Sequence, residues 1–421
     1  MRLLNALVKA RNVDLAEMQA KGVKALTVIA AALPLLGCSA PSESPARTFN
    51  AVSPESLSAE SMQLGCAQKS LESVSLEDRI RSLIMVHIAG RDSQVIHDAV
   101  ERIRPGGLIA MGDNIAAEVA GTAQIFSSVE TMGVPLLLAV DQEGGSVIRI
   151  PQDTFAAGAE LQGVSAESVE EVFSQRASLV KSSGLNTNFG VVADFTNNPD
   201  SFIFPRVLGI NPESAAFAVS AATAGERGKA LTTLKHFPGH GATSQNSHFS
   251  LPTVDKSYEN WRAQEAVPFQ AGIDAGAELV MLGHLVFTAV DSRPASLSSK
   301  WVSVLRSEMG FDGIIITDDL RMLEDSGVPA FSDPAVNSAS ALKAGVTMLL
   351  FVGPSSVEEL VPFIDSVVAE VSRAVSHGEL SEDSLTHEAA RVLAARRNLV
   401  DDNPSAWCHL LAGQYSVTKP S

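Results

Sequence analysis

Basic residues are scarce in this 421-residue chain, which has 31 Lys and Arg against 48 Asp and Glu and a net charge of −17. A chain with this acidic excess repels the phosphates of nucleic acid and does not favour a polybasic contact with a membrane. The sequence therefore argues against a nucleic-acid partner. The length suits one large α/β barrel with additions, or two smaller domains.

Aromatic residues and cysteines are also few, at 5% of the chain and three residues respectively. Because 45% of the residues are hydrophobic, the core must consist mainly of Ala, Val, Leu and Ile, and such aliphatic strands suit a buried parallel sheet. The nine histidines show neither a His-x-His nor a His-Glu-x-x-His spacing. We therefore expect no catalytic metal.

Residues 1–37 are predicted to form a lipoprotein signal peptide. Two lysines precede the apolar stretch Ala25–Leu36, which is too short to span a bilayer and ends in Leu-Leu-Gly followed by Cys38. This pattern matches a bacterial lipobox, so Cys38 is the expected lipidation site; an uncleaved anchor helix is the alternative. Acidic residues before Met18 fit a signal peptide poorly, which favours Met18 over Met1 as the true start.

The rest of the chain divides into three predicted parts. Residues 38–68 are rich in Ser, Pro and Glu and are expected to form a lipidated flexible tether, followed by a folded domain at 69–402 and a short tail at 403–421. We expect an exported domain anchored by lipid to the outer face of the cytoplasmic membrane. Export permits oxidation, so a disulfide between Cys66 and Cys408 is predicted, with two free thiols as the alternative.

Short aliphatic runs alternate with helical patterns along the domain, which predicts a parallel sheet. Eight such units predict a (β/α)8 barrel of the TIM type; a doubly wound open sheet is the alternative, weakened because no Gly-x-Gly-x-x-Gly follows the first strand. The expected strands are Leu83–Ile88, Gly107–Met111, Pro135–Asp141, Asn188–Asp194, Leu231–His236, Leu279–His284, Gly313–Asp318 and Met348–Val352. The expected helices are Ile115–Met132, Ala166–Ser183, Pro212–Arg227, Tyr258–Ala275, Ser299–Met309, Ala335–Ala344, Val357–Ser376 and Ser381–Leu399.

Polar residues end five of the eight predicted strands. These residues are Asp141, Asp194, Lys235 with His236, His284, and Asp318. Because active sites of such barrels lie at the carboxyl ends of the strands, this pattern predicts a site there.

The stretch 231–252 carries three of the nine histidines, one of them His248, and its Pro and Gly residues predict a loop directly after a strand. A surface loop that merely holds histidines is the simpler interpretation. Cleavage of a glycosidic bond needs one group at the anomeric carbon and one that protonates the leaving oxygen. Asp318 can do the first, although a base or a metal ligand is also open to it, and His248 is a natural acid/base near neutral pH. Lys235, His236 and Asp141 are expected to hydrogen-bond sugar hydroxyls.

Three motifs resemble glycoside hydrolase family 3 enzymes of the β-N-acetylglucosaminidase type. They are Lys-His-Phe-Pro-Gly-His-Gly from Lys235 with the later Ser-His248, Asp-Gln-Glu-Gly-Gly from Asp141, and Ile-Thr-Asp-Asp-Leu-x-Met around Asp318. The resemblance covers roughly residues 70–400. It implies a (β/α)8 barrel that removes terminal β-linked N-acetylglucosamine with retention and without a cofactor, with Asp318 as nucleophile and His248 as acid/base.

The same resemblance assigns Asp141, Lys235, His236 and Arg206, the last in Pro-Arg-Val-Leu-Gly, to sugar binding. A lipid-anchored member is similar to actinobacterial envelope proteins that act on cell-wall fragments.

Two positions depart from the family pattern. Asn246 stands where the family has the Asp of an Asp–His dyad, and Ser146 stands where it often has Arg. A neutral amide does not stabilise an imidazolium by charge, and the comparable change in a serine-protease triad costs ~10⁴-fold in rate. The sequence therefore leaves two other functions open: an attenuated or inactive member that binds a glycan or an envelope protein, and a glycoside phosphorylase.

Overall fold

The computed structural model describes residues 54–127, 129, 135–354 and 356–400. The predicted signal peptide, the lipidation site Cys38, the tail 403–421 and Cys408 lie outside the described residues. None of the helices in the described part is long and apolar enough to cross a membrane.

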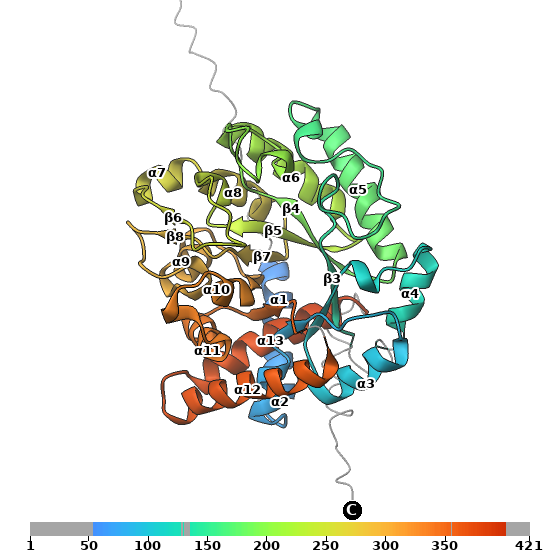
Figure 1. Ribbon diagram of the computed structural model, residues 1–421, viewed down its shortest axis with the longest axis vertical. Helices are drawn as coiled ribbons and strands as arrows, with labels where there is room; N and C mark the ends of the chain where they lie inside the picture. Colours follow the sequence, from blue (N-terminus) through green and yellow to red (C-terminus); the bar gives the residue numbers. More distant parts are fainter. Residues whose placement is uncertain (1–53, 128, 130–134, 355, 401–421) are drawn as a thin grey trace, which may run out of the picture. The chain divides into compact units, whose positions relative to one another are not determined.

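Eight parallel strands close into a barrel in the order β1-β10-β9-β7-β5-β4-β3-β2, and helices surround it (Figure 1). All eight predicted strands are confirmed, and the open-sheet alternative is wrong because β1 pairs with both β2 and β10. The short strands β6 and β8 form a separate two-stranded sheet. The barrel strands are β1 Ile84–Val86, β2 Gly107–Ala110, β3 Leu137–Val140, β4 Thr187–Val192, β5 Leu231–Phe237, β7 Leu279–Leu282, β9 Ile314–Asp319 and β10 Met348–Phe351; β6 is Thr253–Val254 and β8 is Val286–Phe287.

The helices follow the predicted order with local differences. The predicted helix 258–275 is two helices, because Gln264 leaves the helical region (φ −126°, ψ −81°). Pro268 then falls in the first turn of the second helix, where the missing N–H costs little. Helix α2 Leu76–Arg81 precedes the first strand and α12 Val357–Ser376 follows the last. The helices between strands are α3 Ser93–Ile103, α4 Val119–Ser127, α5 Ala166–Ser182, α6 Pro212–Glu226, α7 Tyr258–Ala263, α8 Ala266–Asp274, α9 Ser299–Ser303, α10 Arg321–Asp325 and α11 Pro334–Ala344.

Helix α13 (Glu382–Asn398) lies across the amino end of the barrel. Arg396 donates a hydrogen bond to the carbonyl of Pro135 before β3, and Arg391 donates one to the carbonyl of Asp312 before β9. Thr347, immediately before β10, donates to Glu388. These contacts leave the carboxyl end of the strands as the open end of the barrel.

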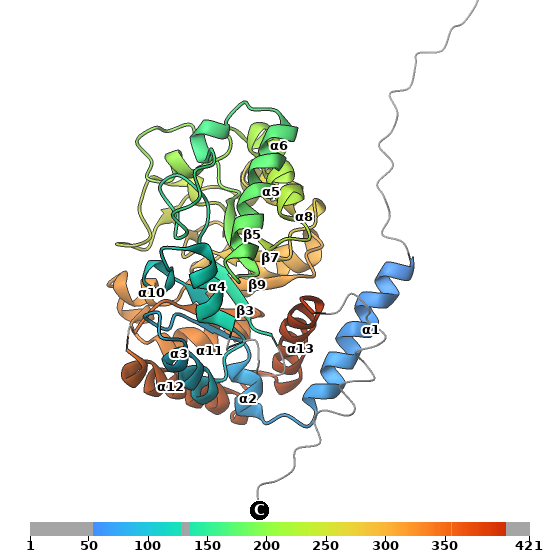
Figure 2. The same ribbon diagram turned by 90° about the vertical axis from the view of Figure 1, so that its right-hand side faces the viewer.

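The predicted flexible tether is wrong for its second half, because Pro54–Leu71 forms helix α1 (Figure 2). This helix packs on α13, where Gln68 Nε2 lies 2.9 Å from His387 Nδ1, and it buries Ala67 and Leu71. The Ser- and Glu-rich composition taken alone predicts a tether. The helix depends on packing against α13, which lies more than 300 residues away in sequence.

Cys66 on α1 is disulfide-bonded. The pairing with Cys408 remains a prediction. Peptide mapping under non-reducing conditions should recover one cross-linked pair that joins Cys66 to Cys408, and recovery of both cysteines as alkylated thiols would contradict the pairing.

Candidate active site

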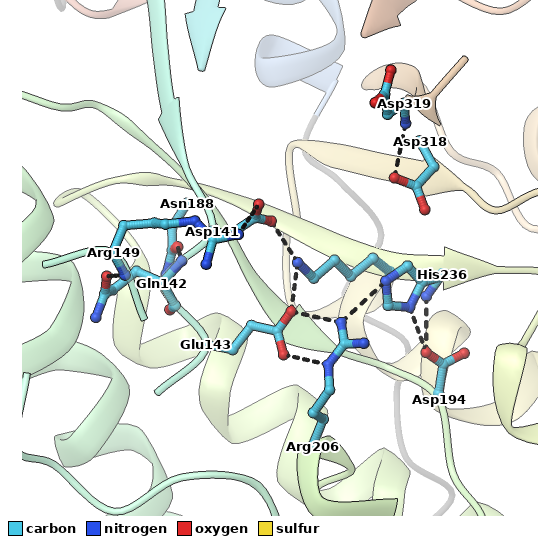
Figure 3. A network of polar contacts seen from close by, with 11 residues as sticks. Asp141, Gln142, Glu143, Arg149, Asn188, Asp194, Arg206, His236, Asp318 and Asp319 are labelled. Atoms are coloured by element: carbon cyan, nitrogen blue, oxygen red, sulfur yellow. Dashed lines mark hydrogen bonds and ion pairs between the residues drawn. The ribbon is translucent and has the colours of Figure 1, made fainter. Parts of the chain in front are cut away.

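Except for Asn246, the predicted catalytic and sugar-binding residues line a cavity of about 330 Å³ at the carboxyl end of the barrel, and Figure 3 shows the polar contacts among several of them. Asp141 follows β3 directly, Lys235 and His236 lie in the last three residues of β5, and Asp318 is the second-last residue of β9. The side chains that line the cavity include Asp141, Glu143, Arg206, Lys235, His236, His248 and Asp318. The carboxyl ends of all strands in a closed barrel surround one opening, which explains why residues so far apart in sequence meet.

Lys235 is the centre of the charged network. Its Nζ lies 2.8 Å from Asp141 Oδ1 and 2.6 Å from Glu143 Oε1, and its side chain is only 3% exposed. Burial lowers the pKa of Lys235, but the two carboxylates outweigh burial and raise it above its ordinary value. Burial likewise raises the pKa of Asp141 and Glu143, and the cations around them more than reverse that shift. All three groups are therefore charged at neutral pH.

Arg206 fixes both Glu143 and the ring of His236. Its Nε and Nη2 donate to the two oxygens of Glu143 at 2.8 and 2.7 Å, a bidentate pair. Its Nη2 also lies 3.3 Å from His236 Nε2. Because a guanidinium only donates, that nitrogen must be the acceptor, so Nδ1 carries the proton and donates to Asp194 Oδ2 at 2.7 Å.

His236 is accordingly neutral. Burial, with the neighbouring Arg206 cation, holds the pKa of His236 well below its ordinary value. Two peptide bonds of this segment, Lys235–His236 and Phe237–Pro238, are cis.

Asp318 is held at the end of β9 by the backbone N–H of Asp319, which donates to its Oδ1 at 2.8 Å. Burial raises the pKa of Asp318, but the charged and hydrogen-bonding groups around it, among them the Lys235 cation and this N–H, outweigh burial, so the pKa lies below its ordinary value. The carboxylate is ionised at neutral pH and faces the cavity.

His248 lies at the rim of the same cavity on the loop after β5, and its side chain is exposed. The loop is pinned at the preceding residue, because the buried Ser247 hydroxyl lies 2.9 Å from His240 Nε2.

Asn246 does not line the cavity. Its Oδ1 accepts the backbone N–H of His248 at 3.0 Å, an Asx turn that shapes the loop. The side-chain amide of Asn246 therefore binds the backbone of the loop that carries His248.

Sequence reasoning named Asp194 as a strand-end residue without giving it a role, and it missed Glu143 and Arg149 as supporting residues. Glu143 lies in the quoted motif Asp-Gln-Glu-Gly-Gly, two residues after Asp141, and that position was the signal that could have found it. Arg149 Nη2 lies 3.4 Å from Asp141 Oδ2, so the loop supplies a cation three residues beyond Ser146. Arg149 lines the cavity, and Ser146 is not among the described residues that do.

Comparison with known proteins agrees with this geometry. Residues 75–395 match the family profile described as "Glycosyl hydrolase family 3 N terminal domain". This match covers most of the chain. The chain belongs to glycoside hydrolase family 3.

Individual relatives agree with the family. A beta-hexosaminidase of Pseudomonas aeruginosa is 33% identical over 61% of this chain and 77% of its own. The solved structure of a family 3 beta-N-acetylglucosaminidase from Paenibacillus sp. is 28% identical, with a TM-score of 0.70, over 80% of this chain and 68% of that one. A fungal multi-domain family 3 beta-N-acetylglucosaminidase is 26% identical, with a TM-score of 0.71 over 78% of this chain, which spans 40% of its length.

A buried polar layer beneath the site holds the loop of this family 3 domain that carries Asp141 and Glu143. Asn188 on β4 accepts the backbone N–H of Gln142 at 3.2 Å and donates to its carbonyl at 3.1 Å. The Asn188 amide also donates to Glu226 at the end of α6, at 2.6 Å. Burial raises the pKa of Glu226 to about 8, so this acid is largely protonated at neutral pH.

We predict that Glu226→Gln removes part of the pH dependence of stability. The folded-state pKa of Glu226 is raised, so an unfolded chain releases its proton first, and stability is lost as pH rises from about 4.5 toward 8. The amide keeps the acceptor for Asn188 and cannot ionise. Urea unfolding at pH 5 and pH 8 should show a smaller drop in the free energy of unfolding for Glu226→Gln, by roughly a few kcal/mol.

The control for this experiment is Glu213→Gln, an exposed residue in the first turn of the same helix. Its drop between the two pH values should equal that of the unsubstituted protein. An unchanged drop in Glu226→Gln would show that Glu226 ionises as freely in the folded as in the unfolded chain.

Proposed function

We propose that this family 3 protein is a retaining β-N-acetylhexosaminidase that removes terminal β-linked N-acetylglucosamine from glycans. The observation that carries the proposal is an ionised, half-buried Asp318 that faces a cavity whose other walls carry hydrogen-bonded cations and His248. The relatives described above include a beta-hexosaminidase and a beta-N-acetylglucosaminidase, and these names support N-acetylglucosamine as the sugar.

In the proposed reaction, the Asp318 carboxylate attacks the anomeric carbon while His248 protonates the departing glycosidic oxygen. A covalent glycosyl-enzyme forms, and the aglycone leaves with the proton. His248, now unprotonated, then takes a proton from water as that water attacks the anomeric carbon, which frees Asp318. The sugar is released with its original anomeric configuration.

The remaining groups hold the sugar in place. Lys235 and Arg206 donate to hydroxyls from fixed positions, because both are already bound to Glu143. Asp141 accepts from a hydroxyl, and His236 keeps one tautomer through Asp194 and Arg206. Because these groups are ordered before the sugar binds, little reorganisation accompanies the reaction.

We predict that Asp318→Ala lowers turnover of 4-nitrophenyl N-acetyl-β-glucosaminide by at least about a thousandfold, because it removes the nucleophile. Added azide should restore product formation and give the α-configured glycosyl azide, since only one displacement remains. Turnover by the unsubstituted protein no greater than that of Asp318→Ala would contradict the proposal, and a β-configured azide would contradict the nucleophile.

The loop geometry supports an attenuated rather than an absent acid/base. An Asp at position 246 could keep the hydrogen bond to the His248 N–H with one oxygen and offer a second, charged oxygen to an imidazolium. We therefore predict that Asn246→Asp raises kcat on the nitrophenyl substrate by roughly tenfold or more. Asn246→Ala is the matched control: it loses the turn and should lower kcat.

If Asn246→Asp is no faster than the unsubstituted protein, the second candidate function gains: a non-catalytic barrel that binds a glycan or an envelope protein. Binding of N-acetylglucosamine without turnover would favour it. A glycoside phosphorylase is the remaining alternative, and a rate that depends on phosphate concentration would identify it.

We further propose that the protein works outside the cell on cell-wall-derived glycans, anchored through lipid on Cys38. The lipobox in the sequence supports the anchor. The packing of α1 on α13 supports it too, because it puts the amino-terminal helix at the end of the barrel opposite the site. A Cys38→Ser variant that stays in the membrane fraction would contradict the anchor.

A further inference from the structure

Phe249 is 81% exposed, the largest exposed fraction among the large hydrophobic side chains of the described residues. An exposed apolar side chain contributes no free energy of burial to stability. A single exposed apolar residue is nevertheless common on protein surfaces. Phe249 differs from an ordinary case in its place, because it directly follows His248 in the chain.

The local backbone presents the two rings together. The N–H of Phe249 and the hydroxyl of Ser250 both donate to the carbonyl of Asn246, at 3.2 and 3.0 Å, while the Asn246 side chain accepts from the His248 N–H. The rings of His248 and Phe249 lie 6.4 Å apart with 58° between their planes. This turn holds an aromatic face beside the proposed proton donor.

The volume of the cavity indicates which part of a substrate lies next to the aromatic face of Phe249. At about 330 Å³ it falls at the lower end of the ~300–1,000 Å³ range of small-molecule pockets, which suits one sugar ring. His248 lines the cavity and Phe249 does not. The oxygen that His248 protonates joins the enclosed sugar to the leaving group, so the leaving group lies beside His248, whose neighbour in the chain is Phe249.

We propose that Phe249 is the platform for the leaving group and that it selects a pyranose ring there. One face of a β-linked pyranose carries axial C–H bonds that pack against an aromatic ring, while its hydroxyls point sideways to water. The proposal rests on the proposed glycosidase function and deepens it: the preferred substrate ends in N-acetylglucosamine linked to another sugar, not to a small or acyclic group.

Two substrates test the platform. N,N′-diacetylchitobiose has a sugar leaving group, and methyl N-acetyl-β-glucosaminide has an alcohol leaving group that also needs the proton of His248 but carries no ring. In Phe249→Ala, the ratio of kcat/KM for the disaccharide to kcat/KM for the methyl glycoside should fall about three- to tenfold, as expected for loss of a ring contact. Phe249→Tyr should restore the ratio, and Phe249→Leu should restore it only in part.

Phe217→Ala is the matched control, since Phe217 is 54% exposed on α6 and does not line the cavity. Its ratio should equal that of the unsubstituted protein. Equal losses on both substrates in Phe249→Ala would mean that Phe249 only supports the loop of His248, and an unchanged ratio would mean that it does not touch the leaving group. Either result overturns the proposal.

A binding experiment separates this proposal from the proposed function. If the unsubstituted protein turns over neither substrate, calorimetry with N-acetylglucosamine and with the non-hydrolysable thio-linked disaccharide replaces kinetics. A loss of affinity in Phe249→Ala that is confined to the disaccharide supports the platform even though hydrolysis has failed. Equal affinities of Phe249→Ala and the unsubstituted protein for the disaccharide, or no binding by either, overturn it.

Discussion

The ion pairs of Lys235 with Asp141 and Glu143 are the interaction on which the site depends. They join the end of β5 to the loop after β3. Glu143 also binds Arg206, which belongs to a third segment of the chain. Burying one cation between two anions is tolerable only because a second cation, Arg206, satisfies the remaining charge. A sugar that enters the cavity therefore meets donors and acceptors whose positions are already set.

The barrel separates this network from the elements that close the fold. Helix α13 contacts residues before β3, β9 and β10, and α1 packs on α13, so the amino end of the barrel carries structural contacts. The carboxyl end carries the charged groups of the cavity (Figure 3). Residues of the loops that follow the strands, such as Ser146 and Asn246, can thus vary without a cost to the core.

Strand-end residues were predictable because alternation of strands and helices implies a barrel, and a barrel brings the strand ends together. This logic correctly placed Asp141, Lys235, His236 and Asp318 in one cavity. It could not show that Glu143 binds both Lys235 and Arg206, since that depends on how a loop turns. It also failed for α1, whose helix depends on a partner at the far end of the chain and not on its own composition.

Asn246 shows how one position can serve structure and chemistry separately. Its carbonyl oxygen closes the turn before His248, and an aspartate would close it equally well. The loop conformation is therefore equally compatible with Asn and with Asp at position 246. Only a developing imidazolium would distinguish them, because the amide is neutral. A change between amide and acid at this position would thus alter the energy of a protonated histidine and leave the loop in place, so the shape of the loop is no measure of the catalytic rate.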